Sequence, residues 1–177
     1  MLAQGNGENR KYGWGIDSVA YYWRKIRSLE DWAKPFKGKE LRANCLGDME
    51  TTGPEDSISL WLIDDDLLPL VVVQLAKSGW RNVQDVRYVR LPEDVVRCSG
   101  LAAQQEDEKA PPEPLKGRHY NLHIGTAANL LRFTHDAAAK AECDCFRKAK
   151  LPEAICAALA KSYCQLNDFG EALQKLI

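Results

Sequence analysis

Three consecutive aspartates, Asp64 to Asp66, are the densest group of side chains in the sequence that could do chemistry. They follow the alternating segment SISLWLI (57–63) and precede an apolar segment that begins at Leu67. An aspartate in the first turn of a helix accepts backbone N–H groups and complements the helix dipole. Clustered carboxylates after a strand are also ligands that Mg²⁺ accepts. We interpret the triplet as the start of a helix, with a metal site and an acidic docking patch as the alternatives.

Residues 59–83 resemble the opening of a response-regulator receiver domain, in which a pair of acids after a hydrophobic strand holds a divalent cation. In that family a later strand carries the phosphate-accepting aspartate, and a lysine followed by proline comes after it. Here the region 100–117 contains no apolar strand with an aspartate, and no later Lys-Pro pair follows. The sequence therefore departs from that family where its phosphorylation chemistry lies.

A second group of reactive side chains lies after residue 117, where all three histidines and four of the six cysteines occur. His119 and His123 are four residues apart, a spacing that on a helix would let both hold Zn²⁺. Cys143 and Cys145 have one residue between them, and no second compact pair completes a tetrahedral ligand set at a familiar spacing. We therefore expect no bound metal or other cofactor, and keep a His119–His123 metal site as the alternative.

The same hexapeptide, RHYNLH (118–123), is similar to the ribonuclease motif of HEPN domains, in which an arginine and a polar residue precede a histidine after three further residues. The resemblance implies that Arg118 stabilises phosphate charge and that His123 acts as an acid or base. It also implies an all-helical fold with the motif on a helix. However, apolar residues alternate from Tyr120 to Ile124, which favours a strand. On a strand, Arg118 and His123 would point to opposite faces.

The elements that must position these residues predict an α/β (α+β) fold. A small sheet with a strand–helix–strand (βαβ) unit forms its first half, and helices form its second half. The unit consists of strands at 57–63 and 82–91, expected to be parallel neighbours, joined by a helix at 67–78. A short helical turn is expected at 92–98. Helices are predicted at 17–33, 126–140, 152–166 and 168–177 from apolar spacing and capping residues. Residues 16–177 are expected to form one domain, with a flexible N-terminus at 1–15 and a linker at 101–117.

The composition is that of an ordinary globular chain, with 45% apolar and 28% charged residues and a formal net charge of −1 over 177 residues. This balance excludes a global basic field for nucleic acid and an acid-rich disordered chain. No apolar run follows a basic start, and no window approaches eighteen apolar residues. With six cysteines expected to be reduced, these features predict a cytoplasmic protein that does not contact membranes.

The charge is unevenly placed, and this unevenness predicts interaction surfaces. Residues 46–66 contain seven acids and no base, whereas residues 1–45 contain nine Lys or Arg against five Asp or Glu. The predicted partner-binding residues are the acids Asp48, Glu50, Glu55, Asp56, Asp64, Asp65 and Asp66, together with Trp23, Arg24 and Arg27 of an aromatic and basic helix.

We therefore expect a small protein-binding domain without its own catalysis, of the accessory or inhibitor/immunity type. The partner would be another protein, with a basic protein as the first candidate and nucleic acid as a less favoured one. The alternative is a HEPN-like, metal-independent ribonuclease that uses Arg118 and His123.

Overall fold

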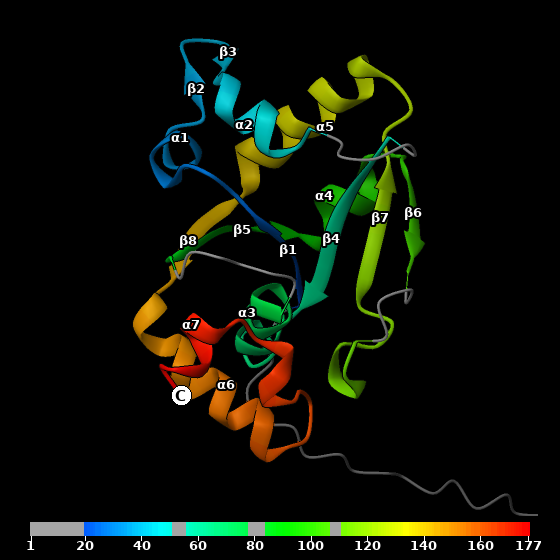
Figure 1. The fold of residues 1–177 in the computed structure, drawn as a ribbon. Helices are drawn as coiled ribbons and strands as arrows, with labels where there is room; N and C mark the ends of the chain where they lie inside the picture. The colour runs from blue at the N-terminus through cyan, green and yellow to red at the C-terminus, as the bar shows by residue number, and fades with distance from the viewer. Residues whose placement is uncertain (1–19, 51–55, 78–83, 107–110) are drawn as a thin grey trace, which may run out of the picture.

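The computed structural model describes residues 20–50, 56–77, 84–106 and 111–177 (Figure 1). The expected flexible segment 1–15 lies outside these residues. The elements in chain order are β1 (Tyr21–Lys25), α1 (Leu29–Ala33), β2 (Phe36–Lys37), β3 (Glu40–Leu41), α2 (Ala43–Asp48), β4 (Ser57–Ile63), α3 (Leu68–Lys77), β5 (Val86–Pro92), α4 (Glu93–Cys98), β6 (Ala102–Gln105), η1 (Glu113–Leu115), β7 (His119–His123), α5 (Ala127–Lys140), β8 (Glu142–Phe146), η2 (Lys148–Lys150), α6 (Leu151–Ala160), η3 (Leu166–Asp168) and α7 (Glu171–Gln174).

A six-stranded sheet with the strand order β6-β7-β4-β1-β5-β8 forms the centre of the fold, and every neighbouring pair is antiparallel. The fold is therefore mixed α/β, as predicted. The prediction of a helical second half was wrong, because β6, β7 and β8 all lie there. Within the predicted linker 101–117, the described residues form the edge strand β6 and the short helix η1.

The strand–helix–strand unit exists as β4, α3 and β5, but its two strands are not neighbours. β1 lies between them and pairs antiparallel with both, so β4 and β5 run parallel to each other without sharing hydrogen bonds. The predicted direct pairing of two parallel strands was therefore wrong. The N-terminal strand takes the place between them.

The helix predicted for 17–33 is instead the strand β1 followed by the short helix α1. Tyr22 packs into the core on one face of the sheet, whereas Tyr21 and Trp23 pack into the core on the other. Aromatic residues fit such a strand well, because side chains on both faces are buried. Helix α1 begins after Ser28, whose Oγ accepts the Asp31 N–H at 3.3 Å.

Two hydrophobic cores lie on opposite faces of the sheet. One includes Trp23 and Ile63 with the apolar side chains of α3, α6 and α7. The other includes Leu60 and Leu122 with residues of α1, α2, α4 and α5. In Figure 1, α3, α6 and α7 lie together at the end of the molecule opposite α2 and α5.

Several predicted elements are confirmed. α3 falls within the predicted 67–78, α5 begins after its N-cap Thr126, and α6 begins at Leu151 with Pro152 in its first turn. The helix predicted for 152–166 is shorter than expected, because α6 ends at Ala160. The helix predicted for 168–177 is shortened to α7, and the capping box lies at Gln165 and Asp168 rather than at Asp168 and Glu171. Among the described residues, no helix combines the length and the apolar character needed to cross a bilayer.

Candidate functional site

The aspartate triplet at the end of β4 starts a helix, and its three side chains have three different surroundings. The Asp64 carboxylate accepts the Leu67 N–H at 3.1 Å, as a residue that starts a helix does. Asp65 accepts the Tyr21 hydroxyl at 2.8 Å and forms an ion pair with Arg90 at 3.1 Å. Asp66 is exposed. Across the described part of the chain, no group of three His, Cys, Asp or Glu side chains is placed to hold a metal ion.

Asp65 belongs to a polar cluster built on β1 and β5. The Arg90 guanidinium lies 5.1 Å from the Tyr21 ring centroid and also pairs with Asp144 of β8 at 3.4 Å. Burial, followed by the hydrogen bond to Asp65, raises the pKa of Tyr21, so its hydroxyl remains a donor at neutral pH. Asp65 thus has an internal partner that connects the start of α3 to the sheet.

Beside Asp66 a groove of about 240 Å³ lies between α3, η1 and α6. Its floor is apolar because α6 presents alanines where larger side chains would fill the space. Its polar lining residues include Asp66 from the start of α3, and Lys161 and Tyr163 from the end of α6. The lining residues are Asp66, Leu67, Pro69, Leu70, Pro114, Ala154, Ala157, Ala158, Lys161 and Tyr163.

A second hollow of about 340 Å³ continues this groove, because it shares Lys161 and Tyr163 with the first. It is also lined by Lys77, Pro112, Glu113 and Ser162. We call the two together the α3–η1–α6 groove. Their common length suits an extended or helical segment that carries one large apolar side chain.

The end of α6 fixes the wall of this groove. Ser162 has a φ of 58°, which is the left-handed conformation that commonly ends a helix. The Tyr163 N–H then bonds to the Ala158 carbonyl at 2.9 Å, and the Ser162 N–H bonds to the Leu159 carbonyl at 2.9 Å. This pair of bonds is a Schellman motif. The chain reverses there, and Lys161 and Tyr163 both line the groove.

The predicted acidic tract is not one patch. Asp56 precedes the first residue of β4 and Asp64 follows the last, so the strand separates them by about 26 Å at its usual rise per residue. Glu50 and Asp56 are exposed near one end of β4, and Asp64 to Asp66 lie at the other. Glu55 lies outside the described residues.

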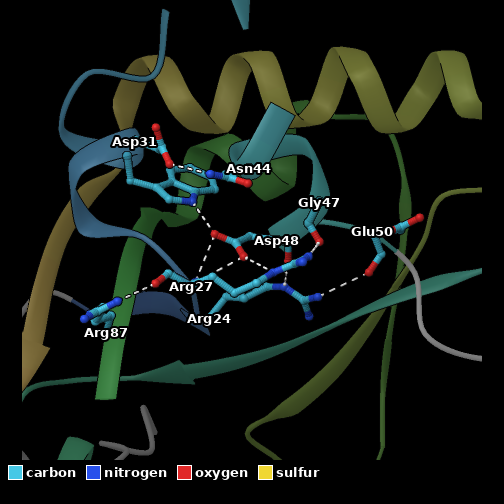
Figure 2. A network of polar contacts seen from close by, with 9 residues as sticks. Arg24, Arg27, Asp31, Asn44, Gly47, Asp48, Glu50 and Arg87 are labelled. Atoms are coloured by element: carbon cyan, nitrogen blue, oxygen red, sulfur yellow. Dashed lines mark hydrogen bonds and ion pairs between the residues drawn. The ribbon is translucent and has the colours of Figure 1, made fainter. Parts of the chain in front are cut away.

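Asp48 is an internal acceptor rather than a surface acid (Figure 2). Its side chain is 2% exposed and accepts the Trp32 indole N–H at 2.9 Å. It also accepts the Arg27 backbone N–H at 3.1 Å and Arg27 Nε at 2.9 Å. Arg27 Nη2 donates to the carbonyl of Gly47. The buried carboxylate therefore joins α1, α2 and the end of β1.

Arg24 connects three backbone segments in the same network (Figure 2). Its guanidinium donates to the carbonyls of Asp48 at 2.8 Å, Ser59 at 2.9 Å and Glu50 at 3.4 Å. Burial lowers the pKa of Arg24 to about 10, which leaves it charged at neutral pH. Trp23 is 2% exposed. Trp23, Arg24 and Asp48 therefore all have internal contacts in this structure, and their role in binding a partner stays a prediction.

The RHYNLH motif lies on β7, not on a helix. His119 and His123 share a face but are separated by about 13 Å of strand, which is too far to share a metal ion. Arg118 donates to the Leu62 carbonyl at 3.5 Å, whereas the His123 ring lies 3.2 Å from Gln104 Oε1. Arg118 precedes β7 and His123 ends it, and their side chains contact different residues, so the structure does not bring this pair together.

The structure does gather a set of side chains that the sequence analysis did not identify. His119 Nε2 lies 2.6 Å from Ser59 Oγ, and His119 Nδ1 lies 3.4 Å from Glu106 Oε2. The Trp61 ring lies 4.7 Å from the His119 ring, centroid to centroid. Ser59 and His119 are sixty residues apart in sequence, so no local spacing could have revealed them. Only the register of β4 against β7 brings them together.

No protein-family model, no curated protein and no solved structure matches this chain at a significant level.

Proposed function

We propose that this chain is a small cytoplasmic protein-binding domain of the accessory or inhibitor/immunity type, and that its partner occupies the α3–η1–α6 groove. The observation that carries this proposal is the open, apolar floor of the groove directly beside the exposed Asp66. Binding energy at protein interfaces concentrates where an apolar anchor fills a pocket surrounded by polar residues.

The size and charge of the groove indicate what the partner presents. A hollow of about 240 Å³ accommodates one large aliphatic or aromatic side chain. Asp66 in the lining favours a basic residue near that anchor, and Lys161 favours an acidic one. The expected segment therefore has an apolar side chain with charged residues of both signs nearby. The whole acidic tract was predicted to contact a basic partner. In this proposal Asp66 alone makes that contact.

The test fills the groove without disturbing the core. Ala157 lines the groove and is exposed, so Ala157→Phe places a ring in the space that the anchor would occupy. Ala160 is exposed on the same helix and does not line the groove, so Ala160→Phe is the matched control. We expect the first change to weaken the affinity for the purified partner at least tenfold by calorimetry, and the second by less than twofold. Equal affinities for both variants would contradict the proposal.

The charge in the lining is tested separately. Asp66→Lys should slow association and weaken binding more at low salt than at high salt, because an exposed charge acts mainly by steering. Asp56→Lys changes the same charge at the opposite end of β4 and should have a smaller effect. An equal effect of the two variants would show that overall charge, not the groove, governs binding.

The HEPN-like ribonuclease remains the alternative function. Arg118 precedes β7 and contacts the Leu62 carbonyl, His123 ends the strand beside Gln104, and the motif lacks the helix that the resemblance implies. We expect purified protein to leave single-stranded RNA intact. RNA cleavage that His123→Ala abolishes would instead favour the ribonuclease.

A further inference from the structure

The group formed by Ser59, His119 and Glu106 lies on the sheet face that carries Trp61, and none of its three residues lines the α3–η1–α6 groove. Ser59 belongs to β4, His119 to β7, and Glu106 follows β6, so three adjacent strands position the three side chains. Ser59 pairs with Asn121 and Trp61 pairs with His119 in the β4–β7 register. Ser59 and His119 are therefore diagonal neighbours on one face, and their polar atoms meet at 2.6 Å.

The position of Glu106 decides which ring nitrogen carries the proton. Its carboxylate faces Nδ1 of His119 at 3.4 Å, which favours a proton on Nδ1. Nε2 is then an acceptor, and Ser59 Oγ–H donates to it. Asn121 Nδ2 donates to the same Glu106 oxygen and holds the carboxylate in place. In this arrangement the carboxylate orients the imidazole, and the imidazole activates the hydroxyl.

The solvent exposure of each side chain in this group suits its role in nucleophilic chemistry. Ser59 is exposed, so its hydroxyl can meet a substrate. His119 is 8% exposed and lies against the Trp61 ring, which shields the base from water. Trp61 is half-buried and offers an apolar surface beside the hydroxyl.

We propose that Ser59, His119 and Glu106 form a nucleophilic centre that cleaves carboxylic esters whose acyl group lies against Trp61. Ser59 Oγ attacks the ester carbonyl carbon, and His119 Nε2 takes the hydroxyl proton. The C–O bond to the alcohol breaks, and the alcohol leaves with that proton. Water then attacks the acyl-serine, gives a proton to His119, and releases the carboxylic acid as Ser59 regains its proton.

Lys25 supplies positive charge on the same face. It lies two residues beyond Trp23, which forms the last β1–β4 pair with Trp61, so it follows Trp23 on the face that carries Trp61 and Ser59. Burial lowers the pKa of Lys25. We assign to Lys25 the stabilisation of the oxyanion that forms on the carbonyl oxygen. Lys25→Met should then lower the rate of acylation and leave the Ser59–His119 contact in place.

The test combines covalent labelling with ester hydrolysis on the intact chain. A fluorophosphonate probe and p-nitrophenyl benzoate are incubated with the folded protein, and the modified residue is located by mass spectrometry. We expect the adduct on Ser59, and a rate of ester cleavage that rises with pH as His119 loses its proton. Ser59→Ala should remove both signals. Ser57→Ala, on the same strand and the same face, should change them less than twofold.

Variants of the other two residues separate catalysis from structure. His119→Ala should lower the rate at least a hundredfold and remove the dependence on pH. Glu106 acts through His119 as a positioning residue. Glu106→Gln should lower kcat about tenfold and leave KM unchanged, because the carboxylate acts on the orientation of His119 and not on the substrate.

The proposal is overturned if folded wild-type protein gives no Ser59 adduct above that of urea-unfolded protein. It is also overturned if Ser59→Ala hydrolyses the ester as fast as the wild type. The adduct on the wild-type chain requires no variant, so a misfolded variant does not obscure the result. This centre is independent of the groove, and the loss of either activity leaves the other unaffected.

Discussion

Replacing Asp48 by alanine tests the network at the centre of the fold. The change removes a carboxylate that is 2% exposed and accepts the Trp32 indole N–H, the Arg27 backbone N–H and Arg27 Nε. Arg27 is 68% exposed at its side chain, so water can replace the lost contact of its guanidinium. The indole and the backbone N–H have no such replacement in the closed structure.

The expected loss follows from these two donors. Each buried donor left without an acceptor costs about 1–3 kcal/mol. Together they predict that Asp48→Ala lowers the free energy of unfolding by about 3–4 kcal/mol. Asp48→Asn keeps the size and one acceptor oxygen, so it should lose about half as much. Urea unfolding, monitored by tryptophan fluorescence, measures the free energy of unfolding of both variants. The slope of that free energy against urea concentration should stay unchanged if the denatured state is the same.

Asp94 provides the control. Its carboxylate forms an ion pair with Lys140 at 2.7 Å, but both side chains are exposed. Asp94→Ala should therefore shift the unfolding midpoint far less than Asp48→Ala. Equal shifts for the two alanine variants, or a loss below about 1 kcal/mol for Asp48→Ala, would refute the description of Asp48 as a buried acceptor.

The two remaining predictions concern a thiol and a strand. Burial, with Asp31 and Asp48 nearby, raises the pKa of Cys45 to about 11. Iodoacetamide at pH 8 should therefore modify the exposed Cys98 and Cys156 and spare Cys45 until urea is added. Equal rates of modification for Cys45 and Cys98, measured by mass spectrometry, would contradict this. The Glu106 N–H bonds to the His119 carbonyl, so alternation directs the Gln104 N–H towards β7 and the Ala103 N–H outwards. Gln104→Pro should then cost about 3 kcal/mol and Ala103→Pro much less, and the reverse order in thermal unfolding would show that the register is wrong.

The parts of the fold that the sequence predicted correctly have strong local signals. Helix α3 is a long apolar segment after three acids, and α5 begins at a threonine cap whose Oγ accepts the Asn129 N–H at 3.2 Å. Strand β7 alternates between apolar residues, with Leu122 in one core, and the polar residues His119, Asn121 and His123 on its other face. These elements differ from the prediction by one or two residues at their ends.

Strand β1 was missed because it has no such alternation. Tyr21, Tyr22 and Trp23 are all buried, since helices cover both faces of the sheet there. A strand buried on both faces carries no polar face, and its aromatic residues also satisfied the spacing of a helix. The edge strand β6 was missed for the opposite reason. All of its residues are exposed, so it has no apolar face and has the composition of a linker.

The candidate sites were predictable to different degrees. The role of Asp64 at the start of a helix depends on local geometry and was expected from the sequence. Asp48 and Asp65 interact with Trp32 and Arg90, which lie 16 and 25 residues away in sequence. The groove depends on the packing of α3 against α6. Such pairings follow from the order and register of the strands and helices, which composition and spacing do not determine.

Site-specific photo-cross-linking tests the proposed binding function most directly. A benzoylphenylalanine at position 157 lies in the α3–η1–α6 groove, and the same group at position 160 lies outside it on the same helix. With the purified partner, the account predicts a cross-link from position 157 to an apolar residue flanked by a basic one, and little from position 160. A partner that binds tightly yet cross-links equally from both positions, or from neither, would show that the groove is not the binding site.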